Sequence, residues 1–287
     1  VDEETTFQIQ AVVTDVDNIT YKEFQTINVI PVDIELPSMI PEPNVFSGTV
    51  GRYKDVVLDG NLVPMTAYNG ELVYSPTYIA TYAYNYYLQY YTYNDEDKLN
   101  KFLNAAKWLK ENCIYTEFGF CSFRFDFYVG FWQVSDDWTS AMAQGQALTS
   151  LIAAAYVTGD TSYTKVAYDA LAAFQYPIEL KGVSSYGEDT IWFEEYGSED
   201  FKSGVLNGFL FSMSGLRSFN KSYPELSLST SLFDAGIKAL EVRLPLMDIG
   251  FTSMYNSAPE LADELRLVSS AKGTGFDLYH ELHVYQL

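Results

Sequence analysis

Two adjacent carboxylates flanked by aromatic rings are the residues of this chain best suited to chemistry. They are Glu194 and Glu195, in the segment W-F-E-E-Y that runs from Trp192 to Tyr196. Neighbouring residues of an extended strand point to opposite faces, so one glutamate is expected to face solvent and the other a cleft. A carboxylate among aromatic rings is partly desolvated, which raises its pKa and makes it a stronger base. Two exposed glutamates on a hairpin are the simpler interpretation of the same segment.

Other reactive patterns are scarce. The chain has two histidines, His280 and His283, whose spacing would place both on one helical face as metal ligands. No Cys, Asp or Glu stands at a clear ligand spacing to complete such a site, so we predict no metal and no cofactor. The absence of a Gly-rich phosphate loop, of G-x-S-x-G and of a Ser/His/Asp pattern argues against nicotinamide chemistry and acyl transfer.

The composition limits the classes of molecule that the protein is expected to bind. A net charge of −21 argues against non-specific binding to nucleic acid or anionic membrane, and it disfavours a highly sulfated substrate. The 24 Tyr and 19 Phe suit a carbohydrate cleft, although core packing explains most of them. No run of about 18 apolar residues exists, so no membrane span is predicted.

The two cysteines allow two interpretations. Cys113 and Cys121 lie eight residues apart, and a hairpin that turns at Phe118-Gly119 would bring them together as a disulfide. Two free buried thiols fit the same spacing.

The N-terminal residues are predicted to form a separate β segment. Residues 4–32 alternate in the manner of strands around a polar D-V-D-N turn, which predicts a long hairpin similar to the last two strands of an immunoglobulin-like module. An extended linker follows, marked by Pro31, Pro37, Pro41 and Pro43. We therefore divide the chain into a β-hairpin or partial immunoglobulin-like segment over 1–36 and a larger domain over 37–287.

The larger domain repeats itself. Helix-like segments begin near Thr77, Ser140 and Leu206, 63 and 66 residues apart. A second helix follows each of them, after Asn94 as N-cap, after Gly159-Asp160 and over about 225–240. Each pair then leads to a short aromatic stretch marked by glycine, which predicts a β-hairpin or loop.

This order predicts a mainly α fold, an incomplete α/α toroid with β-hairpins between its helix pairs. In such a ring the loops between pairs gather at one end and form a cleft. The first helices of the pairs carry small residues that allow close packing: Ala80, Ala143, Ala147, Gly208 and Gly215.

Four ordered segments resemble the C-terminal domain of the glucuronyl C5-epimerases, which invert C5 of glucuronic acid within a polysaccharide. They are W-T-S-A-M-A-Q-G-Q-A-L from Trp138, W-F-E-E-Y from Trp192, V-L-N-G-F from Val205 and Y-H-E-L-H-V-Y-Q-L from Tyr279. The resemblance covers roughly residues 70–287.

The resemblance implies three catalytic residues, Glu195, Tyr255 and Tyr279. The C5 hydrogen is α to the uronate carboxyl, and inversion needs a base on one face of the sugar and an acid on the other. Glu195 is expected to be one base and Tyr279 the opposing acid. Tyr255 is expected to bond the uronate carboxylate or to share in proton transfer.

Further side chains are expected to bind substrate: Trp138, Gln144, Gln146, Trp192, Tyr196, Asn207, Arg124 and His280. One of the two glutamines could instead be a packing residue, and Asn207 could simply cap its helix. The chain also departs from the family. Ala258 stands where animal members have an arginine, for which Arg124 or Arg266 could substitute, and Gly197 replaces a proline.

We expect a uronate C5-epimerase that acts on a polysaccharide containing glucuronic acid. One alternative is a polysaccharide lyase, which shares the C5 proton abstraction and then eliminates the C4 substituent. Another is a non-catalytic glycan-binding protein. A polymeric uronate substrate and the N-terminal hairpin favour an extracytoplasmic location. The sequence does not decide between a monomer and a homodimer.

Overall fold

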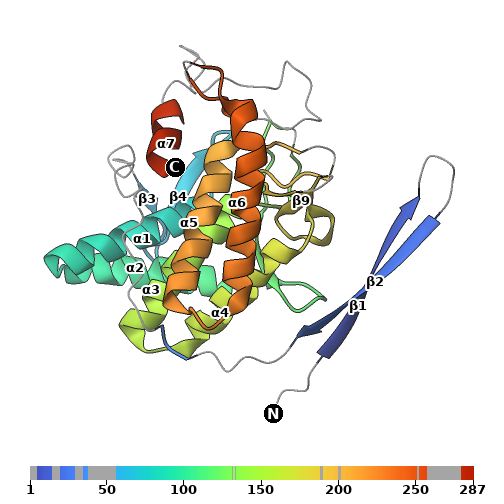
Figure 1. Cartoon of the computed structure of the whole chain (residues 1–287). Helices are drawn as coiled ribbons and strands as arrows, with labels where there is room; N and C mark the ends of the chain where they lie inside the picture. The colour runs from blue at the N-terminus through green and yellow to red at the C-terminus, as the bar shows by residue number, and fades with distance from the viewer. Residues whose placement is uncertain are drawn as a thin grey trace.

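The computed structural model describes residues 5–14, 20–29, 35–37, 56–130, 132, 134–187, 190–199, 202–250, 252–256 and 279–287. This part of the chain is mainly helical and carries small antiparallel sheets (Figure 1). Its helices are α1 (Pro76–Tyr93), α2 (Glu96–Glu111), α3 (Ala141–Thr158), α4 (Thr161–Ala172), α5 (Leu206–Ser222), α6 (Ser227–Met247) and α7 (Tyr279–Gln286). Short 3₁₀ turns cover Ala173–Gln175 and Ile178–Leu180.

The predicted helix pairs are confirmed. Helices α1 and α2, α3 and α4, and α5 and α6 contact each other in turn, and α5 and α6 stand side by side in Figure 1. The predicted cap of the second helix is wrong by one residue. Asn94 closes α1 in the left-handed region at φ 52°, and the Asp95 carboxylate caps α2 by accepting from the amide of Asp97.

Helix α3 is the centre of the helical part, because it contacts α1, α4 and α5. Its contact with α5 depends on glycine, as the small residues of the sequence indicate. A Cβ added at Gly145 would lie 2.7 Å from the Cα of Ser212, and one at Gly215 would overlap the backbone of Gly145. The helical pairs are therefore packed backbone to backbone at this crossing. Closure into a toroid stays a prediction.

The N-terminal hairpin is also confirmed. Strands β1 (Thr5–Thr14) and β2 (Thr20–Val29) pair antiparallel, with Thr5 opposite Val29 and Thr14 opposite Thr20. The D-V-D-N turn and three linker prolines, Pro31, Pro41 and Pro43, lie outside the described residues. The immunoglobulin-like character of this segment and the boundary at 36 stay predictions.

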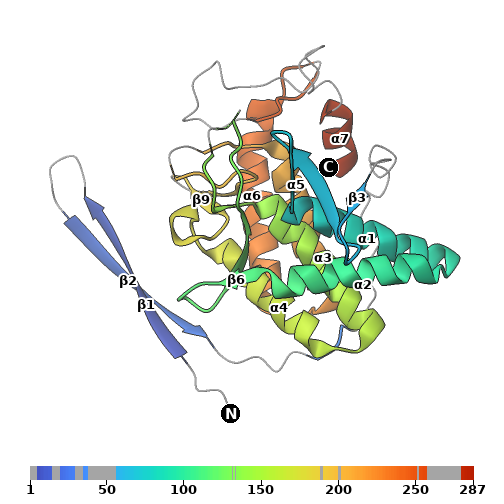
Figure 2. The ribbon, with the colours of Figure 1, turned by 180° about the vertical axis from the view of Figure 1, so that it is seen from behind.

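One sheet was not predicted. Strands β3 (Val57–Leu58), β4 (Pro64–Tyr68) and β5 (Glu71–Val73) form it in the order β3-β4-β5. The turn between β4 and β5 is Asn69-Gly70, whose φ angles of 50° and 86° fit a two-residue hairpin turn. The Asn-Gly pair, which favours a two-residue turn, is the sequence signal for this hairpin. Seen from behind in Figure 2, β4 lies on the viewer's side of α5.

A β-hairpin or loop was predicted after each helix pair, and the first two stretches form hairpins. Strands β6 (Cys113–Tyr115), β7 (Cys121–Phe125) and β8 (Trp138–Thr139) form one sheet, and β9 (Ser184–Tyr186) pairs with β10 (Ile191–Phe193). The third stretch is only a tight turn with a single bridge between Asp248 and Ser253. Gly250 makes that turn at φ 89°.

Of the two interpretations of the cysteines, the disulfide is the one found. Cys113 and Cys121 are bonded, with their Cα atoms 5.4 Å apart across the turn at Gly119. The bond closes the β6–β7 hairpin, whose strand β7 packs against α3 and α4.

Replacing both cysteines with alanine is expected to lower the free energy of unfolding by about 2–3 kcal/mol, the range for so short a closed loop. Urea unfolding of parent and variant measures this difference. Reduction of the parent is the matched control and should give the same loss, whereas equal midpoints for all three samples would contradict the prediction.

Within the described helices, none is both long and apolar enough to cross a bilayer. Across the same residues, no three His, Cys, Asp or Glu side chains gather closely enough to hold a metal ion.

Candidate active site

Hydrogen bonds on both sides fix the backbone that follows β10. The amide of Glu194 donates to Val183 O at 2.9 Å, and the amide of Ala141, at the start of α3, donates to Glu194 O at 2.8 Å. Glu194 is completely buried and Glu195 is 8% exposed. The prediction that one of the two glutamates faces solvent is therefore wrong, because helices α5 and α6 pack against β10 and both side chains are enclosed.

Glu194 is an anchor rather than a free carboxylate. It accepts hydrogen bonds from the Ser185 hydroxyl at 2.7 Å and from the Ser203 hydroxyl and the Gly204 amide, both at 2.9 Å. Burial raises its pKa, while these donors and the nearby charge of Arg243 oppose the rise. Glu194 thus ties β9 and β10 to the residues that precede α5.

This anchor places Glu195 against the first turn of α5. A Cβ added at Gly208 would overlap the Glu195 side chain and lie 2.7 Å from its Cγ. Val205, the N-cap residue of α5, has no side chain that could accept from the free amides of the first turn. The positive end of the helix dipole therefore acts on the nearby Glu195 carboxylate. Oε2 of Glu195 is buried, and no residue in the described part of the chain forms a hydrogen bond with it.

The environment brings the pKa of Glu195 close to neutrality. Burial is the largest influence and raises the pKa to about 7, while the Tyr196 hydroxyl and the Gly208 amide act in the opposite direction. A base with a pKa near the working pH is the most effective proton acceptor. Glu195 therefore has the properties of a general base.

Three tyrosines and a tryptophan surround this base. The Tyr196 hydroxyl lies close enough to Glu195 and to Tyr255 to influence the pKa of both. Trp132 lies 5.4 Å from Tyr196 and 6.5 Å from Tyr255 between ring centroids, and Tyr255 meets Tyr279 edge to face at 4.7 Å. The structure thus brings the three residues expected to be catalytic into one cluster.

Backbone contacts hold Tyr255 in this cluster. The amide of Leu206, the first residue of α5, donates to Tyr255 O at 2.9 Å, and Val205 bridges to Asn256. Burial and the charge of Glu195 raise the pKa of Tyr255 well above 10, and burial does the same for Tyr196. Both hydroxyls are therefore protonated at neutral pH and can donate.

Helix α7 carries Tyr279 into the cluster from the chain terminus. His280 Nδ1 accepts from the Ser253 amide at 3.1 Å, and His283 Nδ1 lies 2.8 Å from the Ser253 hydroxyl. Burial lowers the pKa of His283 to about 4, so this histidine is neutral. Gln286 Nε2 donates to Asn207 O at 3.3 Å at the start of α5. His280 thus serves to dock α7 in this structure.

The sequence did not identify two members of the cluster. Tyr68, on β4, is near enough for the charge of Glu195 to contribute to its raised pKa, after burial. The Asn69-Gly70 turn was the available signal for the strand that carries it. Trp132 lies in an aromatic loop with no motif, so no sequence signal could have found it.

The expected substrate-binding aromatics take different positions. Trp138 stacks on Tyr196 with centroids 5.6 Å apart, and its Nε1 donates to Phe127 O. Trp192 is completely buried, stacked on Phe209 at 3.9 Å, with the Arg243 guanidinium 4.7 Å from its ring. Trp138 therefore supports the cluster directly, whereas Trp192 packs beneath it.

Among the polar residues expected to bind substrate, the two glutamines form hydrogen bonds with other groups of the protein. Gln144 is completely buried and makes three hydrogen bonds, with Phe123 N, Cys121 O and Ala170 O. Gln146 Oε1 accepts from the Thr81 hydroxyl at 3.0 Å. Asn207 is buried at the second position of α5, and its Oδ1 has no hydrogen-bond partner among the described residues.

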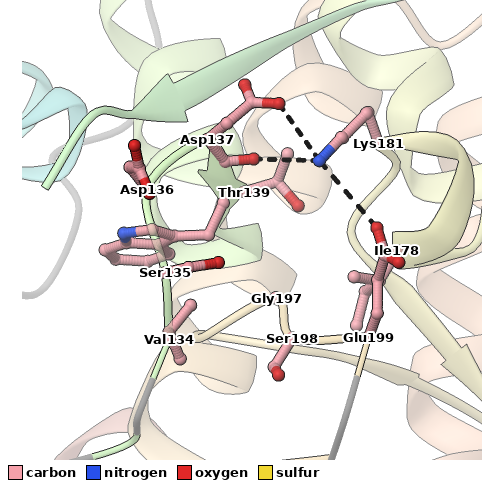
Figure 3. Close-up of a pocket in the computed structure, with 11 residues that line it drawn as sticks. Val134, Ser135, Asp136, Asp137, Thr139, Ile178, Lys181, Gly197, Ser198 and Glu199 are labelled. Atoms are coloured by element: carbon pink, nitrogen blue, oxygen red, sulfur yellow. Dashed lines mark hydrogen bonds and ion pairs between the residues drawn. The ribbon is translucent and has the colours of Figure 1, made fainter. Parts of the chain in front are cut away.

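Arg124 pairs with Asp137, a residue that lines a polar pocket next to the cluster. The Arg124 guanidinium lies 3.0 Å from this carboxylate, so its charge is already balanced. Asp137, Trp138, Thr139 and Gly197 contribute to the lining of this pocket, which holds about 190 Å³. Lys181 bridges Asp137 and Glu199 across it, at 3.1 Å and 3.9 Å (Figure 3). Ala258 and Arg266 lie outside the described residues.

Gly197 shows why glycine is suitable after W-F-E-E-Y. Its amide donates to Thr139 O at 2.8 Å, a bond that proline could not make. A Cβ at this position would lie 2.7 Å from the same oxygen. The departure from the family proline is thus matched by a close backbone contact that fixes the chain after Tyr196.

The comparisons with known proteins agree with this arrangement. Residues 117–287 match the family described as D-glucuronyl C5-epimerase C-terminus. A relative named D-glucuronyl C5-epimerase, from Caenorhabditis elegans, is 35% identical over 167 residues, which cover 52% of this chain and 25% of the relative. The chain thus spans about a quarter of the length of that relative. On the match over residues 117–287, the chain belongs to the D-glucuronyl C5-epimerase C-terminus family.

Proposed function

We propose that this protein is a uronate C5-epimerase that acts on a polysaccharide containing glucuronic acid. The observation that carries the proposal is Glu195, a buried carboxylate with a pKa of about 7 that is surrounded by protonated tyrosines. Family membership supports it, because the relative that matches is named for this reaction.

In this mechanism Glu195 removes the C5 proton, which is acidified by the neighbouring uronate carboxyl. The electron pair of the C–H bond passes into an enolate-like dianion. Tyr279 then gives a proton to the opposite face of C5, which inverts the centre. Tyr255 hydrogen-bonds the uronate carboxylate as negative charge builds there, because its high pKa keeps the hydroxyl protonated.

The test is to incubate the protein with a glucuronate-containing oligosaccharide in D₂O. An epimerase incorporates deuterium at C5 and forms the iduronate epimer, both visible by NMR. A rise in ultraviolet absorbance from a 4,5-double bond would show a lyase instead. Binding of the oligosaccharide with neither product would show a glycan-binding protein.

The pH dependence follows from the same carboxyl group. Glu195 must be ionised to accept a proton, so kcat/KM is expected to fall about tenfold per pH unit below about 7 and to level off above it. Burial keeps the pKa values of Tyr196 and Tyr255 well above 10, so neither residue causes a decline in rate near pH 8. Initial rates from pH 5 to pH 9 measure the profile, and a flat profile between about pH 5 and pH 7 would contradict it.

We also propose an extracytoplasmic location. The disulfide between Cys113 and Cys121 supports it, since such bonds form and persist in oxidising compartments. Fractionation of the native host, with the protein detected by antibody, tests this proposal.

A further inference from the structure

The polar pocket beside the cluster around Glu195 shares a wall with that cluster. Trp138 and Gly197 both contribute to the lining of the pocket. Trp138 stacks on Tyr196 with ring centroids 5.6 Å apart, and Gly197 follows Tyr196 in the chain. The Gly197 amide donates to Thr139 O at 2.8 Å, which fixes the backbone of this wall. A chain of sugars with one unit in the cluster therefore has the pocket directly beside it.

The size of the pocket suits one unit of such a chain. Its volume of about 190 Å³ is below the range of about 300–1,000 Å³ in which independent small-molecule sites fall. A free ligand confined to this space would bury little surface. A sugar unit that is linked to a uronate in the cluster needs little affinity of its own, because the linkage raises its effective concentration at the pocket.

The charged lining of the pocket is mainly acidic. Among the described residues that line it, Asp136, Asp137 and Glu199 carry carboxylates and Lys181 carries an ammonium group. The Lys181 ammonium lies 3.1 Å from the Asp137 carboxylate and 3.9 Å from that of Glu199, as Figure 3 shows. Burial acts to raise the pKa of Asp137, but hydrogen bonds from Arg124 and Lys181 hold it below its ordinary value. The Asp137 carboxylate is therefore ionised at neutral pH.

These carboxylates still have room for a ligand. The side chains of Asp137 and Glu199 are 56% and 61% exposed, so their oxygens can accept further hydrogen bonds. The hydroxyl groups of a sugar are donors, and hydrogen bonds to an ionised acceptor are stronger than those between neutral groups. A sulfate group has acceptors and negative charge only, so carboxylates repel it. Lys181 does not offset this repulsion, because both carboxylates already share its charge.

From this lining we propose that the pocket binds an unsulfated sugar unit next to the reacting uronate and rejects a sulfated one. The pocket thereby selects a polysaccharide in which the unit on one side of the uronate carries free hydroxyls. This selection rests on the proposed epimerase function.

The experiment compares three trisaccharides that have a central glucuronate between two neutral sugars. One is unsulfated, one has a sulfate on the unit before the glucuronate, and one has it on the unit after. Calorimetry measures Kd with Glu195→Gln, which does not consume them, and deuterium incorporation at C5 gives kcat/KM with the parent. By both measures one sulfated trisaccharide is expected to be at least about tenfold poorer than the unsulfated one, and the other within about threefold, because the pocket lies on one side of the cluster.

Glu199→Gln tests whether the pocket causes this preference. Loss of one carboxylate charge should reduce the preference for the unsulfated trisaccharide by about threefold or more, in the parent and in the Glu195→Gln background. Glu111→Gln on α2 is the matched control and should keep the full preference. Its side chain is 57% exposed and 3.8 Å from Lys107, much as Glu199 is 61% exposed and 3.9 Å from Lys181.

Other outcomes overturn the proposal. Equal weakening of both sulfated trisaccharides would assign the effect to the net charge of the protein, and so would equal changes in the two variants. An unchanged preference in Glu199→Gln would show that the pocket does not set it. The binding measurements do not depend on turnover, so a parent that incorporates no deuterium at C5 but keeps the one-sided preference in binding would refute the proposed function alone. Absence of binding by all three trisaccharides would refute both.

Discussion

Glu195→Gln is expected to reduce C5 epimerisation by at least about 10³-fold, because an amide cannot accept the C5 proton. The side chain keeps its shape, so substrate binding should change little. The loss should therefore be found in kcat rather than in KM. Deuterium incorporation at C5 measures this loss without depending on which epimer predominates.

Glu194→Gln is the matched control, one residue earlier in the chain and equally buried. Its Oε1 can still accept from Ser203 and Gly204, while Nε2 turns towards the Ser185 hydroxyl, which can accept as well as donate. Activity is therefore expected to fall by less than about tenfold. Equal losses in the two variants would show that Glu195 has no special role.

The same substitution at Glu195 should stabilise the protein above neutral pH. The folded protein raises the pKa of Glu195 from 4.5 to about 7, so between these values the folded state binds more protons than the unfolded state. The stability of the parent therefore falls as pH rises from 4.5 to 7, by up to about 3 kcal/mol. Glu195→Gln lacks this penalty, so its Tm should exceed that of the parent at pH 8 and match it near pH 4. A variant that is less stable than the parent at both pH values would contradict the prediction that the ionised form of Glu195 destabilises the folded protein.

Periodicity and spacing predicted the helical framework well, because each helix pair has its own apolar pattern, and α1 to α4 each begin at a side-chain cap. Asn94 shows the limit, since either Asn94 or Asp95 could cap a helix and only the left-handed φ of Asn94 decides between them. Glu194 shows the same limit at the site. Its burial depends on Ser203 and Gly204, which only the folded chain brings to it.

The grouping of the site could be predicted in part. The resemblance named Glu195, Tyr255 and Tyr279, and the structure gathers them around Tyr196. The resemblance could not reveal that the Gln144 side chain forms its hydrogen bonds with three backbone groups of the protein. Nor could a local pattern reveal Tyr68, which reaches the site from a strand far away in the sequence. Contacts between distant segments carry no signal in a single sequence.

Gly208→Ala is expected to reduce activity by about 10²-fold although the reacting groups are unchanged. Alanine at the third position of a helix normally stabilises it by up to about 1 kcal/mol relative to glycine. Here its Cβ would overlap the Glu195 side chain, with Cγ only 2.7 Å away, so the base must move. A displacement of about 1 Å in a catalytic group is enough for such a loss.

The displacement should also change the pH profile. A carboxylate that moves away from the start of α5 loses the Gly208 amide and the helix dipole, both of which favour the ionised form, so its pKa should rise if it stays buried. The fall in kcat/KM on acidification should then begin above pH 7. Gly60→Ala is the control, because a Cβ there meets nothing within 4 Å. A Gly208→Ala protein with the parent's rate and profile would show that the first turn of α5 does not position the base.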